Sequence, residues 1–248
     1  MFDASAQRRK PGDMRPVVIV KLGSTMPHLQ ASRGDYEDWI AAGLDGLRDV
    51  RVCRVVEGDA LPSPEAQRAV VVTGSSALVT DRAAWSERTG AWLKELVAHD
   101  RPLLGICYGH QLLADVLGGE VGMNPDGREI GMIDVQLNER AKSDPLFGVL
   151  PSTIRVSSSH RQSVLGLPRG ARRLASNAAT LNQAYALGER TWAMQFHPEW
   201  DHEVIGAYLE DRFDTLLGEG LDPSALLAGA QASPHGLRIL QRFAEIVS

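Results

Sequence analysis

Strand-length apolar runs alternate with amphipathic helical stretches through the first half of this chain. The strand-like runs are residues 17–22, 50–56, 70–73 and 102–106, and the helical stretches are residues 35–47 and 83–98. Such alternation requires a mostly parallel sheet, because each strand must return through a crossover that covers a sheet face. We therefore predict an α/β fold with an open, mostly parallel sheet flanked by helices on both faces.

The pattern changes after Gly118. Shorter strand-like segments separated by glycines follow at residues 120–122, 130–137, 153–156, 171–176 and 182–187. They predict a small, partly antiparallel extension of the same sheet. Three helical patterns then end the chain, at residues 202–217, 223–230 and 234–247. We expect a loose tail over residues 1–15, one domain over residues 16–200, and a helical C-terminal extension over residues 201–248 packed on that domain.

Cys107 lies between Gly105 and Gly109, where the strand-like run 102–106 passes into the helical run 111–117. A sharp turn from strand to helix presents the intervening side chain, and flanking glycines let neighbouring backbone pass close by. Unpaired amides at a helix N-terminus favour a thiolate over a thiol. We interpret Cys107 as a candidate nucleophile, against the alternative of a small apolar residue buried at a strand end.

A second constellation, His197-Pro198-Glu199, ends another apolar run at residues 191–196. Side chains two residues apart in extended chain point to the same side, and Pro198 restricts the backbone between them. The Glu199 carboxylate could then hold one imidazole nitrogen of His197 while the other faces a thiol. This is the arrangement of nucleophile, base and orienting carboxylate in a catalytic triad.

Gly-Ile-Cys-Tyr-Gly-His-Gln, followed far downstream by Gln-Phe-His-Pro-Glu, resembles the class I, triad-type glutamine amidotransferases. The chain is similar to stand-alone, GMP-synthase-like amidotransferase proteins, and this resemblance implies a flavodoxin-like amidotransferase fold. The resemblance implies that Cys107 attacks the side-chain amide of glutamine, with His197 as general acid and base and Glu199 as its orienter. Ammonia would leave, and water would release glutamate from a thioester.

The resemblance also implies an oxyanion hole, because the tetrahedral intermediate carries a negative oxygen that needs fixed donors. One backbone amide would come from the loop after residues 69–73, at Gly74 or Ser75, and the other from Tyr108. Taken alone, the Gly-Ser-Ser sequence of this loop is also typical of an ordinary turn.

For substrate binding, the resemblance points to Ser158, Ser159 and His160 and to Gln111 in the helix after the cysteine. Gln162 stands where the family commonly has aspartate, which puts recognition of the substrate ammonium in question. Two alternatives stay open at this stage. His160 could be a solvated loop histidine, and Gln111 could cap the turn.

Composition narrows the classes of partner. The net charge of −5, with acids and bases interspersed, argues against nucleic-acid or anionic-membrane binding.

The chain has two cysteines, which form no disulfide framework, and Cys53 lies in an apolar run typical of a core. Cys107 and His110 could in principle bind zinc, but no second close Cys/His pair exists, so we expect no metal and no cofactor. We expect a cytoplasmic location, where a thiol stays reduced.

Three functions are compatible with these residues. The first is a glutaminase or amidotransferase that delivers ammonia to an unidentified acceptor, for instance a partner synthase. The second is a γ-glutamyl peptidase or hydrolase that uses the same three residues on a larger amide, and Gln162 favours it. The third is a non-enzymatic binding module, against which the complete triad argues.

Overall fold

The computed structural model describes residues 13–248, so residues 1–12 of the expected tail lie outside the described part. The strands are β1 (Val17–Lys21), β2 (Val50–Arg54), β3 (Ala69–Val72), β4 (Leu103–Ile106), β5 (Glu120–Met123), β6 (Glu129–Leu137), β7 (Thr153–His160), β8 (Gln162–Gly166), β9 (Arg172–Ser176), β10 (Ala184–Leu187) and β11 (Thr191–Met194). The helices are α1 (Pro27–Arg33), α2 (Tyr36–Gly43), α3 (Ala84–Ala98), α4 (Tyr108–Val116), α5 (Glu139–Lys142), α6 (His202–Asp211), α7 (Phe213–Gly218), α8 (Pro223–Ala228) and α9 (His235–Val247). Two 3-10 turns lie at Val55–Glu57 and Val79–Asp81.

Nine strands form one mixed sheet in the order β2-β1-β3-β4-β11-β10-β9-β6-β7. The strands from β2 to β11 pair in parallel, whereas β10, β9, β6 and β7 continue the sheet in antiparallel fashion. Strands β5 and β8 pair separately. The predicted mixed sheet is confirmed, with β10, β9, β6 and β7 as its antiparallel extension. The predicted strand at residues 120–122 does not belong to that extension, because β5 pairs with β8 in a separate two-stranded sheet.

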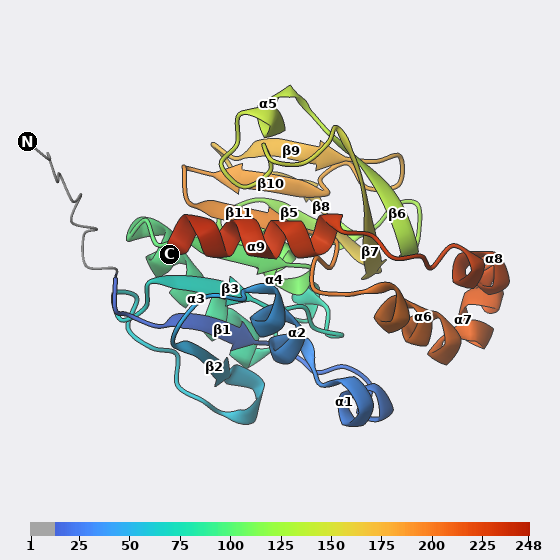
Figure 1. Ribbon diagram of the computed structural model, residues 1–248, viewed down its shortest axis with the longest axis horizontal. Coiled ribbons are helices and arrows are strands. Elements are labelled where there is room, and N and C mark those ends of the chain that lie inside the picture. The colour runs from blue at the N-terminus through green and yellow to red at the C-terminus, as the bar shows by residue number, and fades with distance from the viewer. Residues whose placement is uncertain (1–12) are drawn as a thin grey trace, which may run out of the picture.

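Helices cover both faces of the parallel half (Figure 1). Alternation along β1 sends Val17 and Ile19 into a core shared with α2 and α9. It sends Val18 and Val20 into a second core, shared with α3 and α4. Every β1 residue is buried, so this strand is covered on both faces of the sheet. The predicted helical cover on both faces is therefore confirmed.

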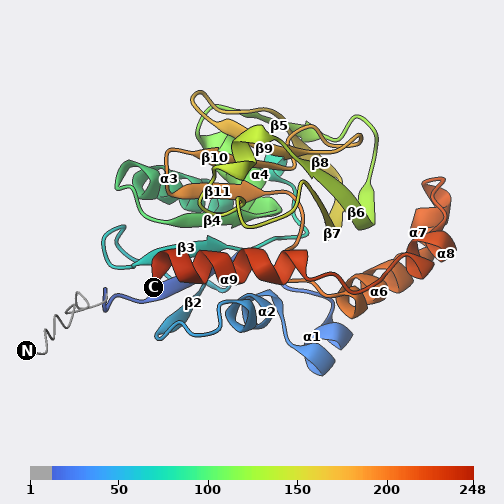
Figure 2. The same cartoon turned by 45° about the horizontal axis from the view of Figure 1, so that its top comes forward.

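The C-terminal helices take two different paths (Figure 2). Helices α6, α7 and α8 form an arm that extends beyond the end of the sheet, where α6 contributes Val204, Ile205 and Leu209 to a third apolar cluster. Helix α9 returns across the sheet and buries Leu240 and Phe243 in the first core. No helix in residues 13–248 has the length and apolar character needed to cross a membrane.

The structure differs from the sequence prediction at several places. Helix α5 was not predicted, and the predicted helix at residues 202–217 is divided into α6 and α7. Helix α1 was not predicted, because its seven residues carry a single buried side chain, Leu29, and no apolar periodicity. Strand β7 runs on to His160, and β8 follows it, where the sequence indicated only a polar stretch. Serines 157–159 lack an apolar alternation, but their backbone pairs with β6, which satisfies the hydrogen-bonding groups.

Neighbouring parallel strands end at one edge of the sheet, and their following residues meet there. Ser24 follows β1, Gly74 follows β3, Cys107 follows β4 and His197 follows β11. Ligands of open α/β sheets bind at this edge, outside the carboxyl ends of the strands. The topology therefore brings together segments far apart in sequence.

Candidate active site

Cys107 occupies a strained turn between β4 and α4. Its φ of 49° lies in the left-handed region, which costs a non-glycine residue roughly 1–3 kcal/mol. The flanking glycines permit the turn: an added Cβ at Gly105 would lie 2.9 Å from the Gly109 carbonyl oxygen, and one at Gly109 would lie 2.8 Å from that of Val72. The turn is held at its start by the Cys107 amide, which donates to the Met194 carbonyl at 2.8 Å. The bracketing glycines are therefore needed for close backbone approach.

His197 and Glu199 form a buried pair behind the thiol. The Nδ1 atom of His197 lies 2.7 Å from Oε1 of Glu199, and both side chains are almost fully excluded from solvent. The His197 amide also donates to the Ser157 carbonyl at 2.8 Å, which ties this segment to β7. Burial alone would lower the pKa of the His197 imidazole, but the charges of Glu199 and Cys107 outweigh it and raise that pKa to about 10.

Gly74 fits against both His197 and Cys107. A Cβ added at Gly74 would lie 2.9 Å from Cε1 of His197 and 3.6 Å from Cβ of Cys107. The loop after β3 thus closes over the junction of the two residues, and a side chain there would displace one of them. The structure brings all three sequence-predicted triad residues together with this predicted oxyanion loop.

Two aromatic side chains that the sequence analysis did not predict, Trp200 and Tyr208, support the His197 imidazole. The Trp200 ring stacks on His197 with centroids 3.7 Å apart and planes 13° apart, and Tyr208 packs behind Trp200 at 4.2 Å. The hydroxyl of Tyr208 is within hydrogen-bonding distance of Tyr36 and Thr25, at 2.8 and 2.9 Å. The only sequence signal was Trp200 directly following Glu199, because Tyr36 and Tyr208 come from α2 and α6.

The thiol opens into a cleft of about 440 Å³. Among the sequence-predicted residues, its lining includes Cys107, His197, Ser75, Gln111, Ser159 and His160. Ser158 lies outside this lining and is fully buried. Glu199 also lies outside the lining, where its carboxylate contacts His197.

Tyr108 can contribute only its backbone to the cleft. Its side chain points away, with the hydroxyl donating to Ser86 at 2.7 Å and the ring 5.4 Å from that of Trp85. Helix α4 begins at Tyr108, so its amide belongs to the first turn, where amides lack intrahelical partners. This position is compatible with the predicted oxyanion role.

Three glutamines lie near the thiol. Gln111 and Gln162 line the cleft, and Gln195 lies beside the Cys107 sulfur. The amide nitrogen of Gln195 lies 3.6 Å from Sγ of Cys107, and that of Gln111 donates to Gln195 and to the Gln162 carbonyl. The side chain of Gln162 accepts from the Val79 amide at 3.0 Å and donates to Thr80 at 2.7 Å. An aspartate at residue 162 could accept from Val79 but could not donate to Thr80, so Gln162 secures this loop.

His160 is buried at the end of β7, so the alternative of a solvated loop histidine is wrong. Its Nε2 lies 2.8 Å from Glu129 and its Nδ1 lies 2.9 Å from the Gln162 carbonyl. Glu129 also accepts from Asn177 and Gln183. Burial tends to raise the pKa of the Glu129 carboxyl, but these donors outweigh it and lower the pKa. The sequence analysis missed Glu129, which lies 31 residues before His160.

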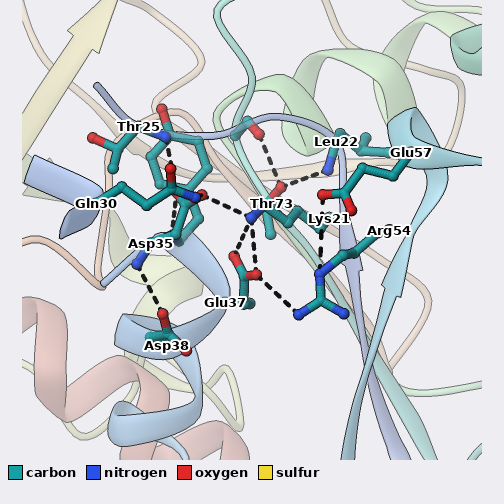
Figure 3. Close-up of polar contacts among 12 residues, drawn as sticks. Lys21, Leu22, Thr25, Gln30, Asp35, Glu37, Asp38, Arg54, Glu57 and Thr73 are labelled. Atoms are coloured by element: carbon teal, nitrogen blue, oxygen red, sulfur yellow. Dashed lines mark hydrogen bonds and ion pairs between the residues drawn. The ribbon is translucent and has the colours of Figure 1, made fainter. Parts of the chain in front are cut away.

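A buried ion-pair cluster holds the β1 side of the cleft (Figure 3). The Lys21 ammonium lies 2.7 Å from Asp35 and 2.8 Å from Glu37, and Asp35 accepts from the Thr25 amide at 2.8 Å. Burial opposes both charges, but the pairing outweighs it, so the pKa of Lys21 is raised and that of Asp35 lowered. Asp35 also caps α2. The cluster thus links α2 to the loop of Ser24 and Thr25 that lines the cleft.

His110 packs in the core rather than facing the cleft. Its ring centroid lies 5.0 Å from that of Tyr185, and burial with the nearby His160 lowers its pKa to about 3. In the described range 13–248, no three His, Cys, Asp or Glu side chains gather as metal ligands would. Cys53 is likewise a buried core residue, as predicted.

The chain is similar to known proteins in sequence and in fold. Residues 61–215 match the family described as glutamine amidotransferase class-I. A glutamine amidotransferase from Thermotoga maritima has a similar solved structure, with a TM-score of 0.72 and 22% identity, over 95% of this chain and 100% of the other. This likeness confirms the fold.

Two curated relatives differ in the reaction that their names describe. A GMP synthase (glutamine-hydrolyzing) from Aeropyrum pernix is 34% identical over 83% of this chain, which spans 37% of the relative's length. Gamma-glutamyl peptidase 4 from Arabidopsis thaliana is 28% identical, with 67% of this chain and 66% of the relative covered. Both are proteins to which this chain is similar.

Proposed function

Because this chain belongs to the class-I glutamine amidotransferase family, we propose that Cys107, His197 and Glu199 hydrolyse the side-chain amide of glutamine. The observation that carries the proposal is the convergence at Gly74. There the strained cysteine turn and the buried His197–Glu199 pair meet beside an open cleft. A binding module that had lost its chemistry would have no need for the strain at Cys107.

The proposed reaction has two halves. The Cys107 thiolate attacks the amide carbon of glutamine, and His197 donates a proton to the leaving nitrogen, so that ammonia departs and a γ-glutamyl thioester forms. His197 then takes a proton from water, which attacks the thioester and releases glutamate and the thiolate. Glu199 keeps the His197 ring oriented in both halves. The backbone amides at Gly74 or Ser75 and at Tyr108 would stabilise the oxyanion, each contributing a few kcal/mol.

Substrate contacts are proposed for the polar groups that line the inner cleft. Gln111, Ser159 and His160 have atoms at its surface. Because the ring nitrogens of His160 are already partnered, its contribution to substrate would come from backbone or ring edge. Ser158 is withdrawn from direct contact by its burial and acts through the backbone of β7.

A diazoketone analogue of glutamine tests the nucleophile. The reagent should add to Cys107, be located there by peptide mass mapping, and abolish release of ammonia from glutamine. Cys53 is the matched control, since burial raises the pKa of its thiol. Labelling at Cys53, or no labelling while glutamine is hydrolysed, would contradict the assignment.

We further propose that a synthase consumes the ammonia. The name of the Aeropyrum pernix relative joins glutamine hydrolysis to GMP synthesis, and this chain spans about a third of that relative. Free ammonia is largely protonated at neutral pH and is then no nucleophile, so delivery to a docked acceptor has a chemical motive. If so, glutamine hydrolysis should accelerate when an ammonia-consuming synthase with its substrates is added, whereas it should not respond to serum albumin.

A γ-glutamyl peptidase is the second candidate, and the size of the cleft favours it. A volume of about 440 Å³ lies in the range of roughly 300–1,000 Å³ that holds ligands larger than one glutamine. Ammonia release from glutamine, measured beside cleavage of a γ-glutamyl dipeptide, separates the two candidates. A higher kcat/KM for the dipeptide would assign the peptidase activity.

A further inference from the structure

The charged groups that line the cleft at Cys107 are mostly positive. Its described lining contains no aspartate or glutamate but three arginines, Arg128, Arg161 and Arg212. The chain as a whole carries 31 acidic against 26 basic residues, so this bias does not follow from composition. A cleft lined by one sign of charge attracts ligands of the opposite sign.

Two of the arginines are already engaged. Arg128 makes a two-pronged ion pair with Glu219, with distances of 2.6 and 2.8 Å. The Arg212 guanidinium lies over the Tyr208 ring, 4.7 Å from its centroid, and pairs with Asp211 at 3.2 Å. These contacts hold the two groups in place, one directly before β6 and one between α6 and α7.

Arg161 differs from both. It forms the exposed turn between β7 and β8, and within the described part of the chain no carboxylate lies close enough to its guanidinium to form an ion pair. Its charge acts at longer range on Glu219, whose pKa is lowered mainly by the bound Arg128 and also by Arg161. The sequence neighbours of Arg161, His160 and Gln162, are buried and hydrogen-bonded, so the backbone under Arg161 is held in place. A guanidinium on a fixed turn can bind a carboxylate through two parallel hydrogen bonds.

Glutamine alone does not account for this charge. Its α-carboxylate could use one cation of the lining, which leaves the others without an anionic group of the ligand. The volume of the cleft also exceeds what one glutamine requires. A ligand with an additional negative group matches both the charge and the space.

We propose that the substrate class is γ-glutamyl amides whose amine portion carries a carboxylate, and that Arg161 binds that carboxylate. The inference rests on the proposed thioester chemistry of Cys107 and specifies the substrate of the second candidate function, the γ-glutamyl peptidase. The bond from Sγ to the γ-carbonyl carbon forms, the bond from that carbon to the amino-acid nitrogen breaks, and His197 supplies the proton to the departing amine. Water then resolves the thioester to glutamate, so the products are glutamate and a free amino acid.

Two substrates that differ only in the distal charge test this role. We expect γ-glutamylglycine to have a kcat/KM about tenfold or more above that of γ-glutamylglycinamide, as a charge-assisted hydrogen bond provides. Arg161→Gln should bring this ratio close to one, and Arg161→Lys should keep part of it. Arg88→Gln is the matched control, because Arg88 is exposed on α3, away from the cleft, and the ratio should stay at its wild-type value.

The α-carboxylate is present in both substrates, so the ratio reports on the distal group alone. A wild-type ratio near one would overturn the inference. So would an Arg161→Gln variant that slows both substrates equally, because Arg161 would then bind the α-carboxylate.

Binding to a Cys107→Ala variant separates this inference from the proposed chemistry. Calorimetric titration should show γ-glutamylglycine binding about tenfold more tightly than the glycinamide, with the difference lost on adding Arg161→Gln. This measurement needs no catalysis. If the diazoketone test excludes Cys107 while the binding difference persists, the proposed function fails but the Arg161 site stands. If both ligands bind equally well, the Arg161 site is wrong.

Discussion

Gly74 shows how a single missing side chain shapes the site. An alanine Cβ there would lie 2.9 Å from Cε1 of His197, closer than normal contact allows, so the imidazole must move. Because a displacement of about 1 Å can cost roughly a hundredfold in rate, we expect Gly74→Ala to lower kcat for glutamine by about that factor. Gly206→Ala, in open space on α6, is the control for glycine replacement. Thermal unfolding of both variants should stay cooperative, and a wild-type kcat in Gly74→Ala would exclude the close contact.

The charge of Glu199 sets the pH dependence expected of His197. The imidazolium must donate a proton to the leaving group, so kcat/KM should fall as pH rises through its pKa of about 10. Glu199→Gln removes the larger of the two charges that offset the effect of burial on the His197 pKa, so the alkaline fall should move to lower pH. A pH profile of kcat/KM measures the shift, with Glu210→Gln, exposed on α6, as the control. An unchanged profile in Glu199→Gln would remove Glu199 from this role.

At the scale of elements, the Lys21 cluster joins β1 to α2 (Figure 3). Lys21→Met removes the ammonium from two buried carboxylates. Asp35 then keeps neutral donors such as backbone amides, and Glu37 keeps the more distant Arg54, at 3.5 Å. Breaking a buried ion pair by removing one partner costs roughly 3–5 kcal/mol, and we expect that loss in the free energy of unfolding in urea. Lys94→Met, on the exposed side of α3, should change it by less than about 0.5 kcal/mol. A similar small change in Lys21→Met would show that the cluster adds no stability.

Elements also differ in how well the sequence predicted them. The strands of the parallel half and helix α3 were predicted to within about two residues, because each has its own apolar pattern. Strand β8 and the end of β7 were missed, since polar residues such as Ser157 are stabilised there by pairing with other strands. Pairing partners distant in sequence leave no local signature.

For the whole molecule, α9 links the C-terminus to the core and to the site. Phe243 packs edge-on against Trp192 of β11, with centroids 6.2 Å apart, and Gly236 lies so close to Pro198 that a Cβ would be 2.6 Å from its carbonyl oxygen. The helix therefore backs the His197-Pro198-Glu199 segment as well as the sheet. A C-terminal helix in this position is part of the folded domain.

We expect Phe243→Ala to destabilise the protein by roughly 3–5 kcal/mol, because it leaves a cavity in the first core. Leu237→Ala on the same helix is the control, since Leu237 is 49% exposed, and its cost should be small. Urea unfolding followed by circular dichroism measures both. Equal free energies of unfolding for the two variants would show that α9 is not part of the cooperative unit.

The amino-acid sequence by itself determined the local chemistry: the glycine-bracketed Cys107, the spacing of His197 and Glu199, and the alternation of strands and helices. These features depend on residues that are close in the chain, so they can be recognised directly from the order and spacing of residues in the sequence. Only the tertiary structure decided that Trp200 stacks on His197, that Glu129 holds His160, and that three arginines surround one cleft. Those arrangements depend on how strands far apart in the chain are ordered in the sheet, and packing of the whole core selects that order.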